Sequence, residues 1–344
     1  MRLLLAMARQ PEALRDAKSA FLAGQAPTAL ELLNSLERVD SRGLVLASRM
    51  ALFASRFEEA EELANQASWS LPCWSRYAKQ AFYLRQEALR KLGRHQQARA
   101  LFSPRPFKDS SNRFYQALRL AVDSTEHLSF YEAHCRDLPL YGASWRSASA
   151  NYLLLLRNLG QTEQAIALAK IRHQQLTGFF KFGQLRSRQK AGAKSKAQWV
   201  TKAAQALQDL DRHLRKHGVE LFLISGTLLG CIREGMILGH DKDIDVGVSD
   251  EYSKEDIRAI IQSCPNLKER EIESRNTIYL EHANSVNIDV FIHYKKDGVK
   301  VAHGGLKAEW VNTPFEVKQI EFLGNHYGVP SNADLYLEEN YGNW

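Results

Sequence analysis

The 344-residue chain has few cysteines, and none of them form a pair that could serve a metal or redox site. Its four cysteines are Cys73, Cys135, Cys231 and Cys264. Zinc and disulfide-exchange motifs place two cysteines about two residues apart, a spacing that does not occur here. We therefore expect buried free thiols, since cysteine is among the residues most often buried.

Long hydrophobic runs are also lacking. No stretch reaches the roughly 18 apolar residues that a membrane-spanning helix requires, and the apolar patch near the start, "MRLLLAMA", is shorter than a signal-peptide core. The sequence predicts no membrane span and a cytoplasmic location. Peripheral attachment at the inner face of a membrane stays an open alternative.

Acidic residues are missing from one segment. Residues 164–208 contain nine Lys or Arg and no Asp or Glu, and subtracting these from the net charge of +7 leaves −2 for the remainder. A solvated linker explains such a run, and a lid or groove for an anionic ligand is the alternative. No nucleic-acid-binding module accompanies it, so we predict no nucleic-acid partner.

The first half of the chain has a helical repeat pattern. In four stretches a small or turn residue is followed five positions later by an alanine inside an amphipathic helix, and "LSFYEAH" supplies a fifth alanine. These alanines are Ala29, Ala60, Ala98, Ala133 and Ala165. Their mean spacing of 34 residues matches tetratricopeptide-like helical hairpins, in which small residues let two helices approach closely. We predict an all-α repeat domain over residues 1–180.

The second half changes period. "AQWVTKAAQALQDLDRHLRKHG" predicts an amphipathic helix that stops at Gly218. Strands are predicted from "VELFLIS", "KDIDVGV", "TIYLEH" and "VNIDVFIHY", and "KKDG" predicts a hairpin turn into "VKVAH". We expect a mixed β-sheet domain over residues 198–344, joined by a basic linker at 181–197. The fold class is therefore α+β, with helical repeats preceding the sheet domain.

Three aspartates lie on predicted strands. Asp243 and Asp245 are two residues apart, so both side chains point to one face while Ile244 points to the other. Asp289 lies inside another apolar strand and completes the cluster if the strands are neighbours. Repelling carboxylates beside a core favour a divalent cation, Mg²⁺ or Mn²⁺, and Asp241 is a further candidate ligand or support. A solvated or salt-bridged edge strand is the alternative.

A Gly-Thr turn precedes these aspartates. Gly226 permits close backbone approach to a ligand, the following helix start favours anions, and Thr227 adds a hydroxyl donor. Arg233 could form a bidentate contact with a phosphate, although a surface arginine is the simpler interpretation. His303 and Lys307 follow a strand and have the same two interpretations.

The strings "SGTLLGCIREG…GHDKDIDVGV" and "PFEVKQIEFLGNHYGVPSNADLYLEENYGNW" together resemble the LicD/fukutin family of the nucleotidyltransferase fold, over about residues 198–344. The resemblance implies a metal-dependent phosphotransferase. Such an enzyme moves ribitol phosphate, glycerol phosphate, phosphocholine or a similar unit from a CDP-linked donor to a glycan hydroxyl, in surface polysaccharide or lipopolysaccharide biosynthesis. It also implies that Asp289 binds metal or activates the acceptor. The sequence departs from the pattern at His240, where an aromatic residue or proline is expected.

Two other functions stay open. A nucleotidyltransferase would move NMP from an NTP to a small molecule or protein and release pyrophosphate. A non-catalytic scaffold would combine the helical repeats with a second domain that only binds. Under any of these functions, the repeats could recruit a protein partner or a second copy of the chain. We expect Tyr341 and Trp344 to pack and close the second domain.

Overall fold

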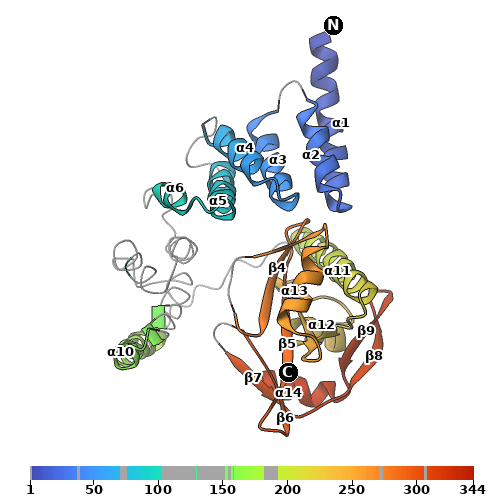
Figure 1. Cartoon of the computed structure of the whole chain (residues 1–344). Helices are drawn as coiled ribbons and strands as arrows, with labels where there is room; N and C mark the ends of the chain where they lie inside the picture. Colours follow the sequence, from blue (N-terminus) through green and yellow to red (C-terminus); the bar gives the residue numbers. More distant parts are fainter. Residues whose placement is uncertain are drawn as a thin grey trace. The chain divides into compact units, whose positions relative to one another are not determined.

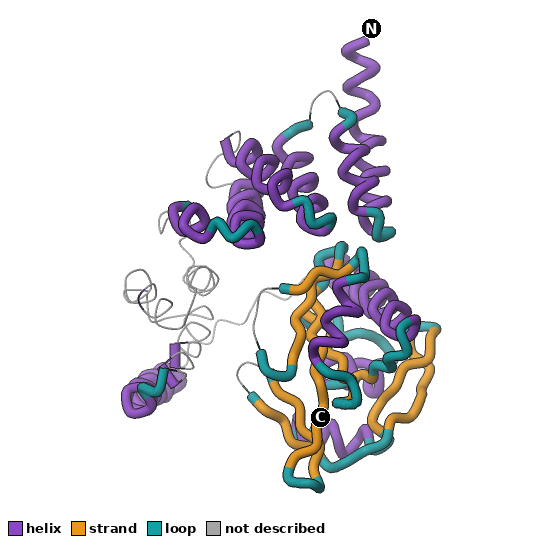
Figure 2. Tube along the Cα trace, viewed as in Figure 1, coloured by secondary structure: helices purple, strands orange, loops and turns teal. Residues whose placement is uncertain are grey.

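The computed structural model describes residues 2–36, 39–69, 76–101, 129, 152–153, 156–157, 159–181, 193–270, 274–305 and 308–344 (Figures 1 and 2). N-terminal helices precede a mixed sheet, which confirms the α+β fold class. The chain forms two compact units, one of Met1–Glu37 with Lys190–Trp344 and one of Arg38–Gln189. No described helix is long and apolar enough to cross a membrane.

The N-terminal helices follow the predicted alanine pattern. They are α1 (Arg2–Leu22), α2 (Ala26–Asn34), α3 (Ser41–Phe53), α4 (Phe57–Trp69), α5 (Arg76–Lys91), α6 (His95–Ala100) and α10 (Thr162–Lys181). Ala29, Ala60, Ala98 and Ala165 lie on α2, α4, α6 and α10, and none is more than 9% exposed. Ala133 lies outside the described residues. Burial of small side chains allows the close helix contact that the pattern predicts.

A left-handed turn residue stands five positions before each of these alanines. Gly24, Ser55, Gly93 and Gly160 have φ angles of 81°, 57°, 70° and 74°. This backbone conformation reverses the chain between two helices and favours glycine. The spacing from turn to alanine is therefore a structural unit, because the same turn sets the start of each second helix.

A buried hydrogen bond of the same kind occurs within each of two helical hairpins. The Ser48 hydroxyl donates to the carbonyl of Ala60 at 2.7 Å, and the Gln86 amide donates to the carbonyl of Ala98 at 3.4 Å. In both cases the donor precedes the alanine by 12 residues. In both hairpins a polar side chain on the first helix thus binds the backbone of the second helix at the buried alanine. Assignment to the tetratricopeptide class stays a prediction.

Within the described residues the sheet has nine strands. They are β1 (Phe222–Leu223), β2 (Asp243–Ser249), β3 (Leu267–Glu269), β4 (Thr277–His282), β5 (Asn287–Lys296), β6 (Lys300–Gly304), β7 (Glu309–Asn312), β8 (Val317–Phe322) and β9 (Asn325–Pro330). The main path runs β3-β4-β5-β2-β1-β9-β8, and β6 joins β5 to β7. β2 pairs with β5, and β1 with β9, in parallel, while the other pairs are antiparallel. The sheet is therefore mixed, as predicted.

Helices α11 (Ala193–Lys216), α12 (Ser225–Glu234), α13 (Lys254–Gln262) and α14 (Ala333–Tyr341) accompany the sheet (Figure 1). α11 has the predicted amphipathic pattern, with Leu207, Leu210 and Leu214 fully buried, and Gly218 follows it with φ of 78°. The hairpin turn before β6 uses Asp297 and Gly298, both with positive φ. Cys231 and Cys264 are buried and free, as expected, and the other two cysteines lie outside the described residues.

The first strand is shorter than its apolar run predicts. Val219, Leu221 and Ile224 are fully buried, yet only Phe222 and Leu223 form strand pairs. The chain turns into α12 at Ser225, so the remaining apolar residues fill the core as flanking segments. This early turn sets the position of the Gly-Thr segment beside β2.

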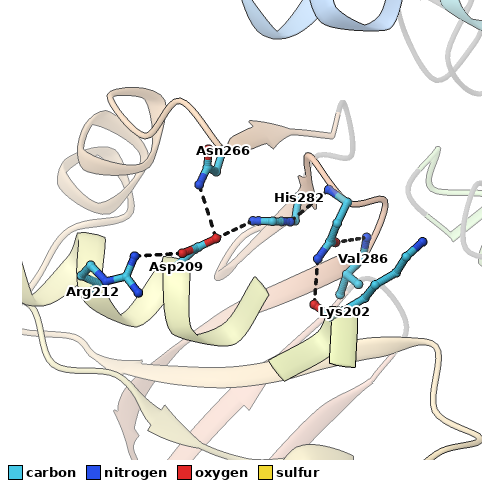
Figure 3. A network of polar contacts seen from close by, with 7 residues as sticks. Lys202, Asp209, Arg212, Asn266, His282 and Val286 are labelled. Atoms are coloured by element: carbon cyan, nitrogen blue, oxygen red, sulfur yellow. Dashed lines mark hydrogen bonds and ion pairs between the residues drawn. The ribbon is translucent and has the colours of Figure 1, made fainter. Parts of the chain in front are cut away.

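A partly buried polar network fastens α11 to the sheet (Figure 3). The Asp209 carboxylate accepts hydrogen bonds from Arg212 at 3.0 Å, Asn266 at 3.3 Å and His282 at 3.1 Å. His282 Nδ1 accepts from the backbone N–H of Asn284 at 3.1 Å, so its Nε2 carries the hydrogen donated to Asp209. Burial tends to raise the pKa of Asp209, but the His282 hydrogen bond and neighbouring positive charge outweigh it and lower that pKa.

Candidate active site

The predicted aspartates meet on neighbouring strands. β2 and β5 are parallel, with Asp245 opposite Asp289 and Asp243 opposite Asn287. Residues that face each other across two strands point to the same side of a sheet. The fully buried Ile244 and Ile288 point to the other side. The structure therefore places three carboxylates on one face of two adjacent strands.

These carboxylates are half-buried and repel one another. Burial, together with the charges of Asp243, Asp289 and Asp241, holds the pKa of Asp245 well above its ordinary value. Burial and the charge of Asp243 raise the pKa of Asp289 to about 7. Burial also raises the pKa values of Asp243 and Asp241. A carboxylate group with shifts of this kind is a strong candidate for a functional site.

The Gly-Thr turn at the start of α12 holds two of these aspartates. The backbone N–H of Gly226 lies close to the Asp245 carboxylate and opposes the rise in its pKa, and the buried Thr227 hydroxyl accepts a hydrogen bond from the backbone N–H of Asp245 at 2.9 Å. A Cβ added to Gly226 would lie 2.3 Å from Asp241 Oδ2. The turn therefore needs glycine for the close approach of Asp241, and it positions the end of β2.

Ser225 makes this turn with a strained backbone. Its φ is 48°, a left-handed conformation that costs a residue other than glycine of order 1 kcal/mol or more. The Ser225 side chain lies close to Tyr341, at the end of α14, and opposes the rise in the pKa of that tyrosine. Strain of this kind persists where surrounding contacts determine the conformation, and it often marks functional sites.

Tyr341 lies beside the carboxylates. Burial and the charges of Asp245 and Asp241 raise its pKa to about 12, although 47% of the residue is exposed. It keeps its proton at neutral pH and can donate it in a hydrogen bond. Trp344 packs against the core, as expected of the chain end. The sequence predicts that Tyr341 packs and closes the domain, but it gives no sign that this residue lies beside Ser225 and the carboxylates.

Arg233 is not brought to this cluster. It lies near the far end of α12, about 10 Å along the axis from Gly226 at the usual helical rise. Its guanidinium pairs with Glu234 at 3.0 Å, and its side chain is 41% exposed. Its role as a phosphate ligand stays a prediction. Arg270, which directly follows β3, lies beside the carboxylates instead. It opposes the rise in the pKa values of Asp243 and Asp289.

His303 belongs to a buried aromatic stack. Its ring stacks on His293 at 4.3 Å and on Trp310 at 5.2 Å between centroids. Burial lowers its pKa to about 4, so it is neutral at physiological pH. These contacts support packing as its role. Lys307 lies outside the described residues.

The donor set suits a hard divalent cation. Mg²⁺ and Mn²⁺ prefer carboxylate oxygens, and the buried Asp289 Oδ1 has no hydrogen-bond partner within the described ranges. Among the described residues, no three His, Cys, Asp or Glu side chains converge closely enough to hold a metal ion. Metal binding by Asp241, Asp243, Asp245 and Asp289 therefore stays a prediction supported by their chemistry and placement.

Comparison with known proteins identifies the segment around this site. Residues 218–332 match the family model described as LicD/FKTN/FKRP, nucleotidyltransferase domain. Ribitol-5-phosphate transferase FKTN of Homo sapiens is 30% identical over 148 residues, and that of Mus musculus is 29% identical over 149 residues. Each alignment covers 41% of this chain and 32% of the relative, so the chain spans about a third of the length of these relatives. The resemblance to the LicD/fukutin family is thereby confirmed for residues 218–332.

Proposed function

We propose that this protein transfers a phospho-alcohol unit from a CDP-linked donor to a glycan hydroxyl. The observation that carries the proposal is the pair Asp245 and Asp289, facing each other across parallel strands inside the segment that matches the LicD/FKTN/FKRP model. The names of the FKTN relatives favour ribitol phosphate. Glycerol phosphate and phosphocholine are the other candidate units. Surface polysaccharide or lipopolysaccharide biosynthesis is the setting that we propose.

Mg²⁺ or Mn²⁺ is the proposed cofactor. Asp243 and Asp245 would hold it, with Asp241 and Asp289 as further candidate ligands. When bound, the cation would supply charge neutralisation for the donor pyrophosphate and the departing CMP. Gly226 and Thr227 would support this group through their contacts with the Asp245 backbone and carboxylate.

Asp289 has two candidate roles, as a metal ligand or as a general base. A carboxylate with a pKa of about 7 can accept a proton near neutral pH. In the second role the glycan hydroxyl gives its proton to Asp289. The hydroxyl oxygen of the glycan then attacks the phosphorus that carries the alcohol. A new phosphodiester bond forms as the bond to the CMP oxygen breaks, and CMP leaves. Positioning and charge neutralisation supply most of the catalysis in phosphoryl transfer.

A nucleotidyltransferase is the second candidate, because the matching family model names a nucleotidyltransferase domain. The same carboxylates would then assist attack by the acceptor on the α-phosphorus of an NTP, and pyrophosphate would leave. The two reactions use one site and differ in the leaving group. The released product therefore separates them.

We also propose a division of labour along the chain. Residues 198–344 would form the catalytic domain, residues 181–197 a basic linker and residues 1–180 a repeat domain that recruits a protein partner or a second copy. The buried alanines and repeated turns support a stacked-helix domain of this kind. We propose that the protein works on the cytoplasmic side, where CDP-linked donors and membrane-bound glycans would meet.

Product analysis tests the proposed function. The purified protein would be incubated with Mg²⁺ or Mn²⁺, a panel of CDP-alcohols with a glycan acceptor, and the four NTPs. Mass spectrometry would detect CMP and pyrophosphate, with Asp243→Ala as the control. We expect CMP from one CDP-alcohol and none from the variant. Pyrophosphate from an NTP would replace the proposal with the second candidate.

A further inference from the structure

Arg270 extends the row of carboxylates across the sheet. Asp245 faces Asp289, Asp289 faces Tyr279 on β4, and the backbone N–H of Arg270 donates to the Tyr279 carbonyl at 2.8 Å. These four residues lie in one line over four neighbouring segments. Residues that face each other across strands share a side of the sheet, so the Arg270 side chain belongs to the carboxylate face.

The charged side chains just before Arg270 are paired. Lys268 contacts Glu281 at 3.4 Å, and Arg258 donates to both oxygens of Glu269 at 3.0 Å. These contacts fix β3 to β4 and to α13. The backbone of Arg270 is therefore held at the end of a well-anchored strand, beside the site.

The Arg270 guanidinium is close to carboxylates without binding them closely. Its Nη1 lies 4.0 Å from Asp289 Oδ1, beyond hydrogen-bond distance. By contrast, Arg258 and Arg215 approach their carboxylates to 3.0 Å and 2.9 Å. Asp289 Oδ1 has no hydrogen-bond donor among the described residues. A guanidinium held as a simple countercharge would be expected to close this gap.

We propose that Arg270 binds the pyrophosphate of the substrate, with its guanidinium donating two parallel hydrogen bonds to phosphate oxygens. This inference rests on the proposed function, because it takes a pyrophosphate-bearing donor as the ligand. A planar guanidinium matches two phosphate oxygens, whereas a lysine ammonium offers a single point charge. Arg270 is thus a candidate for the phosphate-binding role that the sequence analysis gives to Arg233.

The alternative is that Arg270 only neutralises Asp243 and Asp289. The two roles differ in what removal of the guanidinium does to ligands. Loss of a countercharge leaves more negative potential at the carboxylates, so Mn²⁺ binds equally well or more tightly and phosphate binding follows the metal. Loss of a phosphate ligand weakens phosphate binding while Mn²⁺ binding is kept.

Calorimetric titration of the full chain separates these roles, with Mn²⁺ alone, then inorganic pyrophosphate and CDP in saturating Mn²⁺. The variants are Arg270→Gln and Arg270→Lys. Arg212→Gln is the matched control, because that side chain is 75% exposed and lies on α11. For Arg270→Gln we expect pyrophosphate and CDP to bind about 10- to 100-fold more weakly, as for loss of charged hydrogen bonds, with Mn²⁺ affinity kept.

Arg270→Lys keeps the charge and removes the paired donors, so a weaker affinity for pyrophosphate in this variant also supports the proposal if Arg270→Gln fails to fold. Phosphate affinities equal to those of Arg212→Gln would overturn it. Wild-type protein that binds pyrophosphate but not CDP would overturn the proposed function, while the pyrophosphate comparison would still decide the role of Arg270. Wild-type protein that binds neither would overturn both.

Discussion

Two half-buried acidic sites, Asp209 and the pair Asp245 and Asp289, differ in how their charges are satisfied. Asp209 has three side-chain donors, and its pKa is lowered despite burial. Asp245 and Asp289 face each other across two strands, and their pKa values are raised. The first arrangement stabilises the folded protein, whereas the second destabilises it.

This difference indicates which acidic residues bind a ligand and which stabilise the fold. A carboxylate with donors on every side fastens elements together and has little left to offer a ligand. Carboxylates that repel one another cost stability, and the cost is offset only when a cation or substrate joins them. Substitutions should therefore separate the two groups, because one set removes activity and the other removes stability.

The largest effect is expected at Asp245. Asp245→Asn should lower the rate of CMP release at least about 100-fold, since catalytic groups of this kind contribute that much or more. The melting temperature should stay the same or rise, because the variant removes a buried repelling charge. The rate comes from product analysis and the melting temperature from circular dichroism. Loss of folding instead of activity would remove the distinction between the two groups.

Asp209→Ala should have the next largest effect, on stability. Its removal takes away the carboxylate that accepts from His282, Asn266 and Arg212, and we expect the free energy of unfolding to fall by about 2 to 4 kcal/mol. Urea unfolding followed by circular dichroism measures this change. CMP release well below the melting temperature should stay near that of the wild type. A stable but inactive variant would place Asp209 in the functional group.

A smaller effect is expected from pH. Asp289 has a folded-state pKa of about 7, above its ordinary value of 3.8. The protonated form is favoured by folding, so this contribution to stability is complete below about pH 4 and is lost as pH rises through 7. In metal-free protein, Asp289→Asn should raise the melting temperature more at pH 8 than at pH 5. Each kcal/mol gained in the free energy of unfolding should raise the melting temperature by roughly 2 to 4 °C.

The contribution of Asp209 has the opposite sign, because its folded-state pKa is lowered. Its stabilisation is present above the ordinary pKa and is lost as pH falls through the lowered value. Melting curves of Asp209→Ala and Asp289→Asn from pH 2 to 8 cover both changes and therefore sharpen the comparison. Parallel pH profiles in the two variants would contradict it.

The smallest effect is expected at Gly226. In Gly226→Ala the new Cβ would meet Asp241 Oδ2 at 2.3 Å, and the end of the Asp241 side chain would have to move. We expect CMP release to fall by roughly tenfold, as for the loss of a residue that positions a metal ligand, with little change in melting temperature. Unchanged turnover would show that the position of Asp241 does not matter for activity.

Local patterns predicted much of the fold. The turn-to-alanine spacing and the alternation in "KDIDVGV" are short-range, because a helix or strand repeats its side-chain directions every few residues. The pairing of Asp245 with Asp289 was expected only on condition that their strands are neighbours. The strand order β3-β4-β5-β2 meets that condition.

The parts that sequence could not predict depend on distant segments. Arg270 approaches Asp289 only because β3, β4 and β5 are adjacent, and its short charged segment gives no sign of this. Tyr341 reaches Ser225 through the packing of α14. The Asp209–His282 contact joins residues 73 positions apart. By contrast, the distance of Arg233 from Gly226 follows from the helical rise alone.

The central claim is that the carboxylates around Asp245 and Asp289 bind a divalent cation. Calorimetric titration of metal-free wild type and Asp245→Asn with Mn²⁺ tests this claim most directly. We predict saturable binding to the wild type, and binding at least about tenfold weaker in the variant. Asp209→Asn, which alters the satisfied group, should bind Mn²⁺ like the wild type. Equal affinity in wild type and Asp245→Asn would contradict the account.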